Sequence, residues 1–577
     1  MKIIKKITAR IISIGLSAAM ILILFSGCVG ANNGEGYAFS YSLTSNPKNL
    51  DPQVATDNNS LLVLRNMFEG LMRLDKNGDL INGVAERVDP NDAFTEYTFY
   101  LRKDTFWSSV VVDTKKTTTT TAPDDGEPTQ PEEEIEVKIP VTAHDFAFAW
   151  KRALDPLTGS TTASALYCIR GGEAFNNGTG TADALGITVI DEYTLKVTLE
   201  YPFSEFPLQT TLAVFMPCNQ EFFESTKGHY GLDDLYIIAN GPFCFGKHGA
   251  WNHDNWVRII RNENYKGENR VLPSVLYLGI RKSDVDYFDL LENTVEAAKI
   301  EPYNVYKLDK SGYIPYSFAD KTIGLAFNTD DYVYGSGNIN AFSNVNVRLA
   351  FIKAITTESY ESFLSDGHNI ASDIIPSATK LNGVRYRDLV DERMKIASDP
   401  ENALQQLKTG LTQMGMPKMQ KVTIIYPESE EHTSMLHGML KCWENSLKEY
   451  VNLEPVPESD LKTRISLGQY QVALCNISPT KDGPLACLQM FRPGAAGNPS
   501  MFNDQAFNAM VDQAAAKTNT QDILQYLVAA EKFLNNQAVF FPLYYDSTYY
   551  ATWPTVDGIY FSPFDGTADF LSATCTK

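Results

Sequence analysis

Basic residues are scarce in this sequence of 577 residues: 49 lysines and arginines stand against 70 aspartates and glutamates, a formal charge of −21. So acidic a surface repels phosphate backbones, which excludes nucleic acid as a partner. Glycine and proline, at 37 and 28, are too few for a fibrous or low-complexity protein. The 44% hydrophobic content excludes overall disorder, and the length predicts two or three structural units.

Cysteine is also sparse, and its spacing excludes two common uses. Seven cysteines follow Cys28, spread between positions 168 and 575, and an odd number so widely spaced is not a disulfide framework. No two of them have the Cys-x-x-Cys spacing of a zinc site, and the seven histidines are too scattered for a metal centre. We therefore expect free thiols, with one disulfide left open, and neither a metal nor a cofactor.

The motifs of common enzyme classes are missing. The sequence contains no GxxxxGK[ST], no HExxH and no GxSxG. His144-Asp145 lies at a predicted helix start after Thr142, where aspartate is a routine first-turn residue. The sequence predicts that the chain is not an enzyme, although a pair of catalytic carboxylates would leave no motif.

The N-terminus lacks an apolar run long enough to cross a bilayer. The uncharged run at 11–25 is shorter than the roughly 20 residues that a spanning helix needs, and it follows a basic stretch at 1–10. This pattern predicts a secretory signal peptide over 1–27. Ser26-Gly27-Cys28 resembles the bacterial lipobox, which implies lipidation of Cys28 and a flexible tether over 28–36. The alternative is an ordinary signal peptide with an incidental cysteine.

Patterns typical of strands and helices alternate along the rest of the chain, which predicts an α/β protein. A segment at about 113–134, with five consecutive threonines and almost no apolar residue, predicts a disordered surface loop between the arms of a hairpin at 110–112 and 135–139. The strand patterns lie at 97–102, 193–199, 257–261 and 422–426, and the helical patterns at 61–72, 143–154, 345–355, 435–450 and 523–535.

An ordered series of short motifs runs from about Tyr37 to the C-terminus. Each motif alone is weak, and many are turn or strand chemistry. The series includes Leu50-Asp51-Pro52, Met67-Phe68-Glu69-Gly70-Leu71, Asp75-Lys76-Asn77-Gly78, Phe106-Trp107-Ser108, Ala149-Trp150-Lys151-Arg152, Asn240-Gly241-Pro242-Phe243, Phe327-Asn328-Thr329, Asn346-Val347-Arg348, Gly468-Gln469-Tyr470 and Phe541-Pro542-Leu543-Tyr544. In this order the motifs resemble the peptide-type extracellular solute-binding proteins of ABC importers, the family typified by the oligopeptide-binding proteins.

The resemblance implies a bilobal α/β fold of the periplasmic-binding-protein type (type II, large peptide-binding class). An extra subdomain is inserted in the first lobe. Lobe I is expected at 37–66, 196–300 and 540–577, the inserted subdomain at 67–195 and lobe II at 301–539. The expected activity is capture of an oligopeptide or related small solute between the lobes by hinge closure. The expected partners are the permease and ATPase subunits of an importer. The chain itself is expected to be a monomer, lipid-anchored on the outer face of a Gram-positive type envelope.

The chain departs from the family's pattern in the second lobe. Relatives that bind free peptides carry Trp-x-x-Asp there, and the aspartate pairs with the peptide's N-terminal ammonium. In this sequence Ile477 falls at the tryptophan and Thr480 at the aspartate, with Asp482 two residues on. A hydroxyl cannot replace a charge-assisted bond, so either Asp482 takes over or the ligand lacks a free amine at that spot. The candidate ligand-binding residues are Thr480, Asp482, Ile477 and Asn328.

Two other functions stay open. One is an extracellular hydrolase acting on cell-wall peptides or glycans, and the other is a sensor that kept the binding scaffold. Turnover of a substrate would distinguish the hydrolase, because a receptor returns its ligand unchanged. Trp107, Trp150 and Tyr167 are expected to belong to the scaffold rather than to a ligand site.

Overall fold

The described part of the chain begins after the predicted tether. The computed structural model describes residues 37–108, 138–246, 249–267, 270–281, 286–391, 393–479, 481–495 and 497–576. Cys28 with its signal peptide and tether, the loop predicted over 113–134, and Thr480 lie outside these residues. Within them, we find no helix that is both long and apolar enough to cross a membrane.

One large mixed sheet runs through the molecule. It has twelve strands, of which ten form a continuous path while β14 (Asn369–Ile370) pairs with β20 and β9 (Trp251–Asn252) with β10. Along the path the order is β18 (Val451–Val456), β17 (Val422–Pro427), β19 (Val472–Ile477), β13 (Ile314–Phe327), β20 (Phe540–Thr552), β12 (Ala297–Ile300), β1 (Ala38–Leu43), β11 (Val275–Ile280), β10 (Trp256–Arg261) and β8 (Phe243–Cys244).

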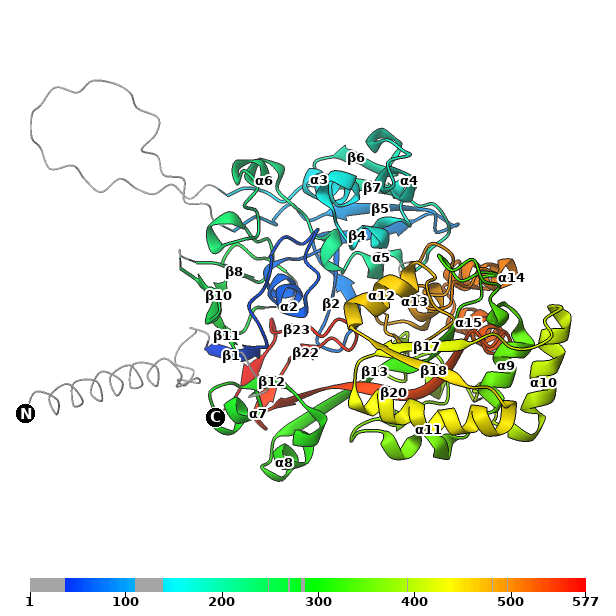
Figure 1. The fold of residues 1–577 in the computed structure, drawn as a ribbon. Coiled ribbons are helices and arrows are strands. Elements are labelled where there is room, and N and C mark those ends of the chain that lie inside the picture. Colours follow the sequence, from blue (N-terminus) through cyan, green and yellow to red (C-terminus); the bar gives the residue numbers. More distant parts are fainter. Residues whose placement is uncertain are drawn as a thin grey trace, which may run out of the picture.

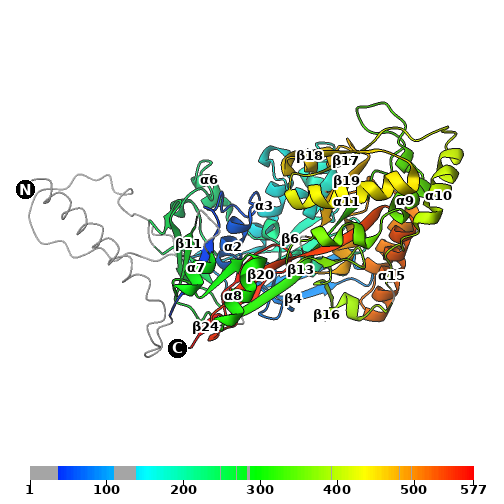
Figure 2. The same ribbon diagram turned by 60° about the horizontal axis from the view of Figure 1, so that its bottom comes forward.

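The two longest strands, β13 and β20, form the centre of this sheet. They pair antiparallel, and both run between the two ends of the molecule (Figure 2). β20 is rich in tyrosine and threonine, as strands prefer, and most of its side chains are buried. The register shifts between Phe318 and Lys321, where the buried Asp320 accepts a bond from the Thr548 amide at 2.9 Å. Such a bulge bends the strand that carries it.

Two groups of elements flank the central strands. We define lobe II as β17–β19 with α9–α15, and lobe I as β1, β8–β12 and a separate four-stranded sheet with α3–α6 (Figure 1). That sheet has the order β4 (Ala85–Pro90), β5 (Glu96–Leu101), β7 (Thr194–Thr198) and β6 (Ile187–Asp191). Four two-stranded ribbons complete the strands: β2–β3 (Met72–Leu74, Leu80–Asn82), β15–β16 (Lys380–Leu381, Val384–Arg385), β21–β24 (Val556–Asp557, Thr574–Cys575) and β22–β23 (Tyr560–Phe561, Ala568–Asp569).

The helices and strands agree with the sequence patterns to within a few residues. The strand patterns at 97–102, 193–199, 257–261 and 422–426 match β5, β7, β10 and β17, and the helical patterns match α2, α3, α9, α11 and α15. The pattern at 61–72 extends too far, because α2 ends at Met67 and Met72 begins β2. The hairpin arm predicted at 110–112 and most of the arm at 135–139 lie outside the described residues. The helices are α2 (Asn58–Met67), α3 (Ala143–Leu154), α4 (Gly172–Asn176), α5 (Phe206–Gln209), α6 (Gln220–Ser225), α7 (Asp286–Leu291), α8 (Val305–Lys310), α9 (Val345–Lys353), α10 (Pro400–Gln413), α11 (Glu430–Leu447), α12 (Glu458–Ser466), α13 (Pro484–Gln489), α14 (Gln505–Ala515) and α15 (Thr520–Asn536).

Helix α3 begins with the capping residues that the sequence predicted. The Thr142 amide donates to the Asp145 carboxylate at 2.8 Å, which caps the first turn. Burial raises the pKa of Asp145 to about 6 despite the bonds that it accepts from Thr142. The role of Asp145 at a helix start is thus confirmed.

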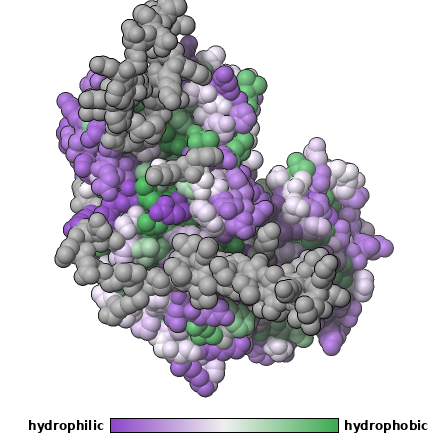
Figure 3. Space-filling view, turned by 90° about the vertical axis from the view of Figure 1, so that its left-hand side faces the viewer, coloured by the Kyte–Doolittle hydropathy of each residue, from purple (hydrophilic) through white to green (hydrophobic). Residues whose placement is uncertain are grey.

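The seven cysteines in the described residues are all free, as expected. Burial raises the pKa of the Cys168, Cys218, Cys244 and Cys475 thiols to about 12. On the face shown in Figure 3, hydrophilic residues predominate among the described residues, with smaller hydrophobic patches between them.

A cluster of charged side chains ties the central strands to lobe II. The His368 ring lies 2.8 Å from Glu431 and 3.3 Å from Asp546 of β20, and Lys321 of β13 lies 3.2 Å from the same Asp546. Burial lowers the pKa of His368, but its bonds with Asp546 and Glu431 outweigh burial and raise the pKa to about 9. The imidazolium therefore holds two carboxylates together at neutral pH.

We expect this histidine to make the stability of the fold decrease at alkaline pH. A pKa that rises from 6.5 to about 9 on folding contributes stability that is complete below pH 6.5 and is lost as the pH rises through 9. The contribution is at most roughly 3 kcal/mol. Urea unfolding from pH 6 to 10 should show this fall in wild type and not in His368→Gln. His437→Gln, at an exposed position of α11, is the matched control, and equal profiles for all three proteins would contradict the assignment.

Candidate functional site

A large cavity lies where lobe I and lobe II face each other. Its volume is about 1430 Å³. The lining comes from five parts of the chain that are far apart in sequence, so it exists only in the folded protein. These parts are 55–80, 161–216, 380–383, 478–495 and 560–567.

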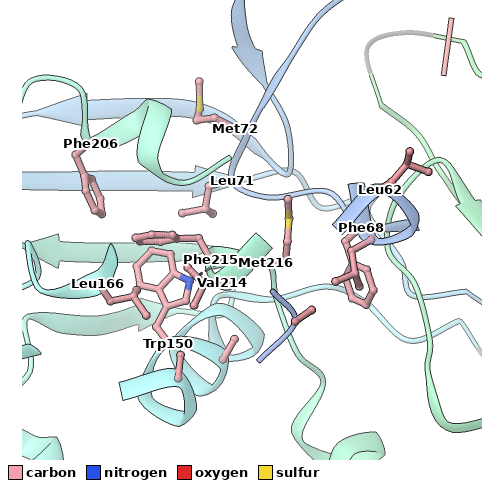
Figure 4. Packing of buried hydrophobic residues seen from close by; sticks show 14 of the residues in the cluster. Leu62, Phe68, Leu71, Met72, Trp150, Leu166, Phe206, Val214, Phe215 and Met216 are labelled. Atoms are coloured by element: carbon pink, nitrogen blue, oxygen red, sulfur yellow. Dashed lines mark hydrogen bonds between the residues drawn. The ribbon is translucent and has the colours of Figure 1, made fainter. Parts of the chain in front are cut away.

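The segment at 212–216 forms one apolar wall of this cavity. Val214 and Met216 line the cavity, while Phe215 between them points into the core beside Trp150 (Figure 4). The Trp150 indole donates to the Phe215 carbonyl at 2.9 Å, and its ring packs edge-on against Phe215 with centroids 5.3 Å apart. The buried Gln53 donates to the carbonyls of Met216 at 2.9 Å and Val214 at 3.4 Å. The backbone of this wall is therefore fixed from behind.

A second wall belongs to the segment at 201–205, which connects the four-stranded sheet to α5. The Phe203 carbonyl accepts a bond from the Tyr97 hydroxyl at 2.7 Å, which holds the segment to that sheet. From there Glu205 reaches the cavity. Its carboxylate lies 3.7 Å from the Lys481 ammonium of lobe II.

Directly after β19, the described residues of the 478–483 loop line the cavity from the side of lobe II. Gly483 has φ of +132°, which an L side chain rarely adopts, and this turn leads into α13. Asp482 lines the cavity and accepts a bond from the Lys380 amide at 2.7 Å. Burial raises the pKa of Asp482 to about 6.

Charges of both signs line the cavity. Arg65 lies 3.5 Å from Asp565, and its guanidinium carbon is 5.3 Å from the centre of the Tyr560 ring. A site with paired charges and apolar walls suits a large solute with both polar and apolar groups. Among the described residues no group of histidine, cysteine or acidic side chains has the arrangement of a metal site.

Of the candidate ligand-binding residues that the structure describes, one lines the cavity. Asp482 lines the cavity, and Thr480 lies outside the described residues. Ile477 is fully buried at the end of β19, and the buried Asn328 donates to the carbonyls of Gly468 at 3.1 Å and Tyr470 at 2.8 Å. Neither of these two side chains lines the cavity. Contact of any of the four with a ligand stays a prediction.

The aromatic residues expected in the scaffold also divide. Trp107 and Trp150 are fully buried, as expected, but Tyr167 lines the cavity. Sequence reasoning did not find Glu205, Lys481 or the 212–216 wall. Only the place of Lys481 beside Thr480, in the region where the family holds its ligand, could have pointed to one of them.

Two lobes on a shared sheet, with a large cavity between them, define a bilobal binding protein. A family model described as "Bacterial extracellular solute-binding proteins, family 5 Middle" matches residues 79–499, which is most of the chain. The chain belongs to this family of extracellular solute-binding proteins. It is therefore a binding protein rather than an enzyme.

Curated relatives match over nearly the whole length. The chain is 24% identical to the dipeptide-binding protein DppE of Bacillus subtilis over 97% of both chains, and 25% identical to the oligopeptide-binding protein OppA of the same organism over 90% of both. Among solved structures it is similar to peptide-bound OppA of Listeria monocytogenes, with a TM-score of 0.67, 22% identity, and coverage of 94% of this chain and 100% of that one. These neighbours confirm the bilobal α/β fold.

We predict that Gln53→Ala loosens the 212–216 wall. The variant loses the donor to the Val214 and Met216 carbonyls in a buried place, which costs about 1–3 kcal/mol of unfolding free energy. Urea denaturation measures this loss, and the exposed Gln220→Ala serves as the matched control. An unchanged stability for Gln53→Ala would show that these bonds do not hold the wall.

Proposed function

We propose that this protein captures oligopeptides, or related small solutes, in the cavity between its lobes and delivers them intact to an ABC importer. The observation that carries the proposal is the cavity itself. Its volume of about 1430 Å³ exceeds the roughly 300–1,000 Å³ of pockets for drug-sized ligands, and both lobes line it. Such a space suits a ligand several residues long.

The names of the relatives support the same ligand class. They are described as dipeptide-binding, oligopeptide-binding and murein peptide-binding proteins. One relative, 22% identical, is described as a probable deoxycholate-binding protein, so the scaffold has also been assigned a ligand that is not a peptide. Peptides are the first ligands to test.

The proposal includes an opening and closing motion at the central strands. β13 and β20 connect lobe I to lobe II, and the bulge at 318–321 lies on β13 between them. A ligand that contacts both lobes favours the closed form. The residue boundaries predicted from the sequence, in which the second lobe spans 301–539 and includes β13, also belong to this proposal.

The proposal also places the protein outside the cell membrane as a lipid-anchored monomer. Cleavage before Cys28 and its lipidation would leave the tether at 28–36 between lipid and fold. Permease and ATPase subunits would then receive the solute at the membrane. The lipobox-like sequence and the extracellular family support this placement.

Native mass spectrometry with defined peptide pools tests the capture step. Wild type incubated with a pentapeptide pool should retain peptides of unchanged mass at nanomolar to micromolar affinity. Ala165→Trp, which fills part of the cavity, should lower retention at least tenfold, while Leu157→Trp, at an exposed position of lobe I, should not. Failure of wild type to retain any peptide would refute peptide capture, and recovery of cleaved peptides would favour the hydrolase.

A separate experiment tests the anchor. In a Gram-positive host, wild type should partition into the detergent phase of a Triton X-114 extract, whereas Cys28→Ala should move to the aqueous phase because it cannot be acylated. Cys442→Ala, at one of the free cysteines of the fold, is the control. Equal partitioning of wild type and Cys28→Ala would exclude lipidation at this residue.

A further inference from the structure

The segment at 201–205 makes several contacts that cross between the lobes. The Ser204 amide donates to the Ala515 carbonyl of α14 at 2.7 Å. The Arg492 guanidinium carbon lies 5.6 Å from the centre of the Tyr201 ring. The third contact joins Glu205 to Lys481. In the first two contacts the amide and the guanidinium each have a polar partner. The Ser204 amide has its acceptor, and Arg492 also pairs with an aspartate of its own lobe at 2.6 Å.

The third contact is incomplete. The Lys481 Nζ and Glu205 Oε2 atoms lie 3.7 Å apart, beyond hydrogen-bond distance, and their side chains are 8% and 19% exposed. Both atoms are buried, and neither has a hydrogen-bond partner among the described residues. The centre of the Phe203 ring lies 4.8 Å from the ammonium, a cation–π contact that provides no hydrogen-bond acceptor. A buried ammonium and a buried carboxylate are costly unless other groups complete their bonds.

Both side chains line the cavity, so a solute can supply the missing bonds. The ammonium needs an acceptor and the carboxylate needs a donor. A carboxylate from the solute would satisfy Lys481 but face Glu205, and an ammonium would face the opposite conflict. The N–H and carbonyl of one residue in an extended peptide point to the same side, so such a residue offers a carbonyl to Lys481 and an N–H to Glu205 without adding charge.

We infer that Glu205 and Lys481 together bind the main-chain N–H and carbonyl of one internal residue of the solute, carbonyl to Lys481 and N–H to Glu205. This rests on the proposed function and names the group that the site recognises. Because the pair spans the two lobes, the same solute residue joins them, and occupancy is coupled to closure. The pair selects for a main-chain amide and not for a charged peptide end.

Calorimetry with one peptide in two forms tests this selection. The probe is the tightest-binding sequence recovered from the pentapeptide pool, either free or N-acetylated and C-amidated. Wild type should bind both forms within about threefold. Lys481→Met and Glu205→Leu should each weaken both forms roughly tenfold or more, since each loses a bond between an amide and a charged group. Lys408→Met and Glu401→Gln, which remove the same charges at exposed positions of α10, should change nothing.

A single variant that leaves one charge buried could fail to fold. Glu205→Leu/Lys481→Met replaces the whole pair with apolar side chains of similar size, which buried ion pairs often tolerate. This double variant should unfold at the wild-type urea concentration and bind the capped peptide as weakly as the worse single variant. Wild-type affinity in the folded double variant would overturn the inference.

Ester analogues of the same peptide distinguish ligand contact from a latch between the lobes. Replacing amides by esters one at a time removes single N–H donors. The ester at one position should weaken binding to wild type at least tenfold. The same ester should hardly change binding to Glu205→Leu, because that variant already lacks the carboxylate that accepts this N–H. If every ester weakens wild type and Glu205→Leu equally, the pair touches no solute amide and the inference fails, while peptide capture stands. If no peptide binds wild type at all, the proposed function fails first.

Discussion

The pairing of β13 with β20 is the constraint on which the rest of the structure depends. These two strands carry lobe I and lobe II in one hydrogen-bonded sheet, so the lobes cannot separate without breaking a core ladder. Movement is confined to bending and twisting of this pair. The bulge at 318–321, held by Asp320, marks the place where the ladder is already interrupted.

Around this connection, the two walls from lobe I are held mainly by lobe I, although the Ser204 amide of the segment at 201–205 also donates to the Ala515 carbonyl of lobe II. Trp150 and Gln53 hold the 212–216 wall, and Tyr97 holds the segment at 201–205, all from lobe I. The 478–483 loop follows β19 of lobe II. The proposed closure would therefore bring together surfaces that are largely preformed, which limits the entropy lost on binding.

The sequence predicted the elements and the fold better than the site. Helix α3 was predictable because capping and apolar periodicity are local, and Thr142 and Asp145 act within one turn. Ligand contacts depend on which side of a strand faces the cavity and on what the other lobe presents. The family resemblance made Ile477 a candidate ligand-binding residue, but its side chain is buried in the core. Glu205 lies more than 270 positions before its partner Lys481, and no local pattern joins them.

The free thiols have a consequence for a protein of the cell exterior. The described residues contain no disulfide bond. The stability of this part of the fold therefore does not depend on the redox potential of its surroundings. Four of the thiols titrate only near pH 12 and present almost no thiolate to an oxidant. Folding of the described residues is therefore compatible with both reducing and oxidising surroundings.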